Sequence, residues 1–344
     1  MTDEDLDAGV VAGIITAAQR DALRALAQQR SRAPAMDPGP TADEEKFRVL
    51  GGFNDILVAI GIGLLITGLG VASSATGNPL IITFVAIGSA WGLAEIFTTR
   101  LRLALPSILL AGMFVGSVAI LIGSLLAADT DTPLMAAAGL CATAAALLHY
   151  WRFGVPIDIA IAAGGVVGAI AAVVLSTPAL EPLFATMALV CGLAVFALGM
   201  SFDMRDPRRT TRLADIGFWL HLLAAPLIVH SIIAGFVGAG ADSGIGDNAT
   251  AGVVLALFIL FALVAIVVDR RALLVSGLGY AGYAMAQLFE RVGGEETARA
   301  AVTLIALALV VLAVSAGWRW LRALIVPRLP LGSLAEHLPP AVRA

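Results

Sequence analysis

The fold of this 344-residue chain is decided by apolar runs such as FNDILVAIGIGLLITGLGVA, residues 53–72. Its only ionisable side chain, Asp55, stands near the start, and about 20 such residues cross a bilayer as a helix. Hydrophobic residues make up 59% of the chain and charged residues 13%, against about 25% charged in soluble domains. The composition therefore predicts an all-α, polytopic transmembrane helix bundle.

Working outward from that run, apolar segments follow one another with short polar breaks. We expect about ten spans, near residues 53–72, 78–97, 104–126, 133–150, 156–176, 182–201, 213–237, 249–268, 272–290 and 297–318. Ten spans divide evenly into two five-helix halves, and an odd number per half would make any duplication an inverted repeat.

Loop charges predict the orientation, because cytoplasmic loops are enriched in Lys and Arg. With the N-terminus inside, the cytoplasmic side receives Arg100, Arg102, Arg152, Arg205, Arg208, Arg209, Arg212, Arg270, Arg271, Arg319, Arg322 and Arg328. The opposite loops 73–77, 129–132, 177–181 and 238–248 carry no positive charge, and only the ninth-to-tenth connection departs from the rule, with Arg291 and Arg299. We expect both termini in the cytoplasm and the chain in the bacterial inner membrane.

The first 50 residues differ from the rest, because they are polar and begin acidic, unlike a secretory signal. Thr16-Ala17-Ala18-Gln19 has the spacing of a capping box, which predicts a helix from about residue 17 to 30. We expect a cytoplasmic helical hairpin (1–32), a flexible tether (33–50), the transmembrane domain (51–326) and a proline-rich cytoplasmic tail (327–344).

The motif Gly13-Ile14-Ile15-Thr16-Ala17-Ala18-Gln19, the tether, the apolar spans and the ending Leu338-Pro339-Pro340 resemble the bacterial membrane proteins of the domain-of-unknown-function 2157 family. The resemblance implies this architecture and no particular activity.

Catalytic and nucleotide-binding motifs are missing from the sequence. The cysteines, Cys141 and Cys191, lie inside apolar runs without metal-ligand spacing, and no phosphate-binding loop occurs. We therefore expect no enzyme, no cofactor, no metal site and no nucleic-acid partner. Glycine pairs such as Gly61/Gly68, Gly88/Gly92, Gly112/Gly116 and Gly164/Gly168 predict close helix packing.

Three carboxylates, Asp55, Asp158 and Asp215, begin spans that start on the predicted cytoplasmic side. Each is either a helix-start anchor favoured by the helix dipole, or part of a cluster, Asp55 and Asp158 first, that binds a cation or proton. Glu95 and Asp269 end spans instead, so we expect arginine partners for them, such as Arg100 or Arg270.

Two polar stripes mark the seventh and ninth spans. Asp215, Trp219, Pro226 and His230 fall within about 60° on one helical face, whereas His221 points elsewhere. The second stripe is Ser276, Tyr280, Tyr283 and Gln287. Because polar groups facing lipid lack partners, we expect the stripes to face a common interior, either as a cavity or substrate path or as interhelical hydrogen bonds.

Two functions from different classes fit this pattern. The first is a secondary transporter of a small solute, with a proton or cation as a further partner. The second is a membrane scaffold or sensor that does not transport and that binds a protein through residues 1–32. Both place the chain in a lipid bilayer.

Overall fold

The computed structural model describes residues 7, 10–23, 53–76, 79–126, 132–207, 209, 211–239, 248–271, 273, 274, 278, 281, 282, 285, 296–330, 332 and 338. Within these residues the chain is helical and has no strand. It divides into two compact units, Met1–Glu44 and Glu45–Ala344, and each is described separately.

The N-terminal unit contains the capping box that the sequence predicts. The backbone N–H of Gln19 donates to Thr16 Oγ1 at 3.2 Å, and the backbone N–H of Thr16 donates to the side-chain Oε1 of Gln19 at 2.9 Å. Gly13 has a positive φ of 70° and ends the preceding turn, and residues 17–23 are helical. This helix start is confirmed, and residues 7, 10 and 11 before it are helical. The other residues of the predicted hairpin, 1–6, 8, 9 and 24–32, and the whole tether lie outside the described residues.

The described residues of the second unit form the helices and helical turns that follow. They are α3 (Phe53–Thr76), α4 (Pro79–Ala94), the π-helical turn η1 (Glu95–Arg100), α5 (Ala104–Leu126), α6 (Thr132–Phe153), α7 (Ile157–Ser176), the 3-10 turn η2 (Glu181–Leu183), α8 (Phe184–Arg205), α9 (Arg212–Ala239), α10 (Asn248–Val268), α12 (Glu296–Ala316), α13 (Trp318–Ile325) and the 3-10 turn η3 (Val326–Arg328).

These helices follow the expected spans closely, and the described residues of the expected ninth span, 273, 274, 278, 281, 282 and 285, are also helical. Six described helices are long and apolar enough to cross a membrane: Phe53–Ala72, Leu80–Arg100, Ala104–Leu125, Ile157–Ser176, Glu181–Arg205 and Arg212–Ala234. A seventh span results if α12 and α13, bent by 68°, count as one. Ten spans and the cytoplasmic position of both termini stay predictions.

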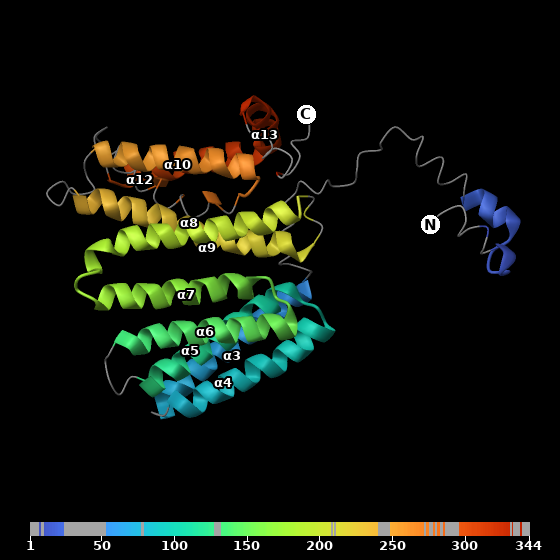
Figure 1. Cartoon of the computed structure of the whole chain (residues 1–344), viewed down its shortest axis with the longest axis horizontal. Coiled ribbons are helices and arrows are strands. Elements are labelled where there is room, and N and C mark those ends of the chain that lie inside the picture. The colour runs from blue at the N-terminus through green and yellow to red at the C-terminus, as the bar shows by residue number, and fades with distance from the viewer. Residues whose placement is uncertain are drawn as a thin grey trace. The chain divides into compact units, whose positions relative to one another are not determined.

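The long helices of this unit lie side by side in roughly one direction, and the short helix α13 turns away from it by 68° after α12 (Figure 1). One hydrophobic core is formed by α7, α8, α9, α10 and α13, and it surrounds Leu220 and Ile228 of α9. Two further cores are formed by α3, α4, α5, α6 and α7, one around Phe114 and one around Leu110. Because α7 contributes to both sides, it connects the two groups of helices.

Glycine allows a close approach of the α6 and α7 backbones, at positions other than the predicted pairs. A Cβ at Gly165 would meet the Gly139 carbonyl oxygen at 2.7 Å, and Thr143 Oγ1 donates to the Ala162 carbonyl at 3.0 Å. The predicted pairs were wrong in this respect, because a Cβ at Gly61, Gly68, Gly88, Gly92, Gly112, Gly116 or Gly168 would meet nothing within 4 Å. The spacing of glycines along one helix shows which of them share a face, but it does not show which face meets a neighbouring helix.

Large apolar side chains cover the outside of this unit. Leu64, Phe84, Leu193 and Leu304 are among the many exposed ones, whereas a soluble monomer rarely exposes a contiguous apolar patch larger than a few hundred Å². Together with the length of the helices, this surface identifies the chain as a helical membrane protein whose outer face contacts lipid.

Candidate functional site

Two histidine–aspartate pairs are buried in neighbouring helical hairpins. The first joins His149 of α6 to Asp158 of α7, with Nδ1 and Oδ2 2.7 Å apart and both side chains fully inaccessible. The three-residue connection 154–156 makes this possible, because it holds the end of one helix beside the start of the next. Gly154 provides the turn with a φ of 65°, a conformation that glycine adopts without steric cost.

The surroundings of the first pair are aromatic. The His149 ring lies 4.6 Å from the Phe153 ring, 5.6 Å from that of Phe114 and 6.2 Å from that of Trp91. His149 Nε2 and Asp158 Oδ1 are buried and have no hydrogen-bond partner. The pair therefore has two open polar atoms in an apolar setting, which is unusual for buried groups.

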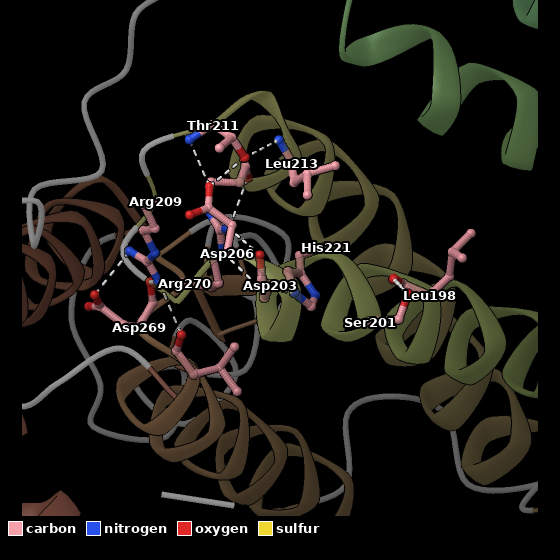
Figure 2. Close-up of polar contacts among 12 residues, drawn as sticks. Leu198, Ser201, Asp203, Asp206, Arg209, Thr211, Leu213, His221, Asp269 and Arg270 are labelled. Atoms are coloured by element: carbon pink, nitrogen blue, oxygen red, sulfur yellow. Dashed lines mark hydrogen bonds and ion pairs between the residues drawn. The ribbon is translucent and has the colours of Figure 1, made fainter. Parts of the chain in front are cut away.

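The second pair joins His221 of α9 to Asp203 of α8, with Nε2 and Oδ2 3.0 Å apart. Unlike the first pair it includes a cation, since Arg270 Nε donates to Asp203 Oδ2 at 3.0 Å and Arg270 Nη2 donates to Oδ1. A further bond runs from Arg270 Nη2 to the Ala214 carbonyl at 2.9 Å. Both carboxylate oxygens are thus occupied, and only His221 Nδ1 is left without a partner (Figure 2).

Two glycines make room for the second pair. A Cβ at Gly199 of α8 would lie 3.0 Å from the His221 ring, and one at Gly217 of α9 would overlap Asp203 Oδ1. The absence of side chains at these positions lets the carboxylate and the imidazole enter the interface between α8 and α9. The pair is therefore built into the packing of the helices.

The formal charges of the two pairs differ. With each imidazole neutral, the first pair carries −1 from Asp158, whereas in the second Asp203 and Arg270 sum to zero. Charges buried without compensation are costly, and a low-dielectric site favours the neutral form. Adding one proton brings the first pair to zero and the second to +1.

A third buried carboxylate, that of Asp269, binds two arginines and a tryptophan at the end of α10. Its Oδ2 lies 2.9 Å from Arg209 Nη1 and 3.3 Å from Arg322 Nη1, and its Oδ1 accepts from Trp318 Nε1 at 2.7 Å. Arg209 also donates to the carbonyls of Val268 and Asp269, and Arg322 donates to that of Ile266. The two guanidinium groups thereby satisfy carbonyls that a helix end leaves open (Figure 2 shows the Arg209 contacts).

Ion pairing of Glu95 and Asp269 is confirmed, but the expected partners were wrong. Glu95 pairs with Arg152 at 2.6 Å and not with Arg100, while Asp269 pairs with Arg209 and Arg322 and not with Arg270. Packing between helices brings in these distant arginines, whereas sequence proximity favours only neighbours.

The other predicted site residues fall into three groups. Asp55 and Asp158 are both buried, and Asp158 makes the pair described above. In the first stripe Asp215 and Trp219 are half-buried, whereas Pro226 and His230 are exposed. The second stripe, Ser276, Tyr280, Tyr283 and Gln287, lies outside the described residues, so a common interior for the stripes stays a prediction.

Sequence reasoning missed His149, Asp203, His221 and Arg270 as members of buried pairs. For the first pair a signal was available, since a short connection between two spans places a histidine near the end of one beside an aspartate at the start of the next. For the second pair no comparable signal exists, because Asp203 lies in the last turn of α8 and His221 in the third turn of α9.

Metal ions and cavities give weaker candidates for a functional site than the buried pairs do. In the part of the chain that the structure describes, no group of three His, Cys, Asp or Glu side chains could hold a metal ion. An apolar pocket of about 310 Å³ lies between α10 and α12, lined by residues such as Phe258, Met285 and Leu307. The buried pairs are therefore the strongest candidates for function.

Searches with this chain found no matching protein-family model, no matching curated protein and no matching solved structure.

Proposed function

We propose that this protein is a secondary transporter of a small solute. The observation that supports the proposal is the burial of two histidine–aspartate pairs within apolar helical hairpins, at 0% side-chain exposure in the first pair. Ionisable groups inside a membrane are expensive and are kept chiefly where they bind or relay ions and substrates.

The position of the pairs supports this reading. α7 and α8 each run the length of the unit once, so the end of α8 and the start of α9 lie at the same end as the connection 154–156, as Figure 1 shows. We call it the arginine-rich end, since it also carries Arg209, Arg212 and Arg270. Both pairs lie near this end, and the positive-inside rule favours the cytoplasm for it.

Transport is tested with the purified full chain. Thermal-shift screening of small metabolites and ions identifies ligands, and uptake of each ligand is then measured in proteoliposomes. We expect at least one ligand to enter faster than into protein-free liposomes. If every stabilising ligand enters at the protein-free rate, the transporter proposal is wrong.

A second function, that of a scaffold or sensor, is favoured by one observation in the N-terminal unit. Val11 and Ile14 are 90% and 79% exposed there, beside a capped helix start. Such apolar side chains suit the docking of a protein partner. Membership of the domain-of-unknown-function 2157 family is likewise our proposal and implies neither function.

Removal of residues 1–40 separates the two functions. A scaffold loses its partner in a pull-down, whereas a transporter keeps its uptake. Retained uptake together with no partner in the full-length pull-down supports transport alone.

A further inference from the structure

We infer that His149 and Asp158 form a proton-binding site of the membrane domain, which takes up one proton and changes the charge of the buried pair from −1 to zero. The inference deepens the proposed function by naming the proton as its coupling ion, and it rests on that function only for the transport measurement below.

The distance within the pair fixes where the first proton lies. Nδ1 and Oδ2 are 2.7 Å apart, and two acceptors at that distance would repel each other, so one proton occupies the line between them. With that proton alone, Asp158 is ionised and His149 is neutral. The pair then has a net charge of −1.

The two open atoms define where a second proton binds. Nε2 of His149 and Oδ1 of Asp158 have no partner, and they are the atoms on which an imidazole or a carboxyl group of this pair accepts a further proton. The donor is hydronium, which leaves as water. No other bond forms or breaks, and a proton needs no cavity.

A cation bonded to the pair would remove the reason to bind a proton, but among the described residues no arginine is bonded to His149 or Asp158. α5 has no ionisable side chain between Ala104 and Leu126. Arg152 of α6 is bound to Glu95 of η1, and Arg212 of α9 donates to the Gly154 carbonyl at 3.4 Å. The remaining charged groups of the elements packed on the pair are the acidic Asp55, Glu181, Asp203 and Asp215, with Arg100 at the end of η1 and Arg205 at the end of α8. The other titratable imidazoles there are those of His221 and His230 in α9.

The helix dipoles favour both ionised forms at this place. Asp158 lies in the first turn of α7 and His149 in the last turns of α6. An anion is stabilised at a helix start and a cation at a helix end. The site therefore accommodates the carboxylate before the proton arrives and the imidazolium after it.

The second pair provides an internal control. Asp203 has both oxygens occupied and is neutralised by Arg270, so a proton added there would create a buried positive charge. We expect the first pair to titrate and the second to keep one protonation state over the same pH range.

The test uses ¹⁵N-histidine NMR and infrared spectroscopy of the purified full chain in lipid nanodiscs. His149→Gln and His221→Gln assign the two imidazole signals, and Asp158→Asn assigns the carboxyl band. We expect the His149 signal and the Asp158 band to change together as the pH is lowered, while the His221 signal does not change. A His149 signal that is constant with pH, or equal titration of both histidines, overturns the inference.

Transport is measured separately with the solute identified above. Asp158→Asn should abolish uptake driven by a pH gradient and keep exchange of solute between the two sides. Thermal unfolding confirms that each variant is folded, and Asp158→Glu serves as a second variant that keeps the charge. Titration without any uptake overturns the transporter and leaves the proton site, whereas uptake without titration does the reverse.

Discussion

The hairpin of α6 and α7 and the hairpin of α8 and α9 solve the same problem differently. Each buries an aspartate against a histidine, yet only Asp203 receives a cation, Arg270, from a third segment. Asp158 receives none, and its partner His149 lies among aromatic rings. The difference lies in the third partner: Asp203 has a permanent counter-charge and Asp158 has none, and we expect only the carboxylate without a counter-charge to respond to protons.

Loss of the positive charge beside Asp203 should have the largest effect on the free energy of unfolding. Arg270→Gln leaves Asp203 buried without a cation, and breaking such a pair costs about 3–5 kcal/mol. Unfolding by denaturant in mixed micelles measures the loss. Arg152→Gln is the matched control, because its ion pair with Glu95 is half-exposed and is worth about 0–1 kcal/mol.

The double variant Asp203→Asn with Arg270→Gln sharpens this result. Because it removes both charges together, it should be more stable than Arg270→Gln alone. If the double variant is no more stable, the ion pair does not explain the difference between the hairpins.

Filling the space that Gly217 leaves for the second pair should have the next largest effect on the free energy of unfolding. Gly217→Ala places a methyl group on Asp203 Oδ1, and overpacking of this kind costs about 1–3 kcal/mol. Gly168→Ala of α7 is the control, since a Cβ there meets nothing within 4 Å. Equal unfolding free energies for the two variants would contradict the assigned packing.

The first hairpin should depend on a hydrogen bond between its helices. Thr143→Val keeps the shape of the side chain and removes its hydroxyl bond to the Ala162 carbonyl, at a cost of about 1 kcal/mol. The same measurement applies, with Thr67→Val as control, because the Thr67 hydroxyl bonds only within its own helix. A larger loss for Thr67→Val would run against this account.

Neutralising the first carboxylate should have the smallest effect on stability. Asp158→Asn removes a buried negative charge that has no cationic partner, so we expect a change of less than about 1 kcal/mol. A loss as large as that of Arg270→Gln would show that Asp158 is balanced by a cation, and the contrast between the hairpins would disappear.

The positions of helices were predictable from the sequence, whereas the partners of Asp203 were not. The runs 104–126 and 156–176 match α5 and α7 within a residue, because span length follows directly from bilayer thickness. His221 was set apart from Asp215 and Trp219 because a helical wheel compares residues of one helix only. Its partner Asp203 belongs to another helix, and their meeting depends on packing at Gly199 and Gly217.

The contacts of Asp269 also impose an order on biogenesis. Arg209 is made before Asp269, whereas Trp318 follows it by 49 residues and Arg322 is made later still. Because chains emerge from the ribosome N-terminus first, Asp269 enters the membrane with its earlier partner already present. The end of α10 reaches its final state only when the last helix has been synthesised, so a truncated chain ends with this carboxylate half-satisfied and exposed to quality control.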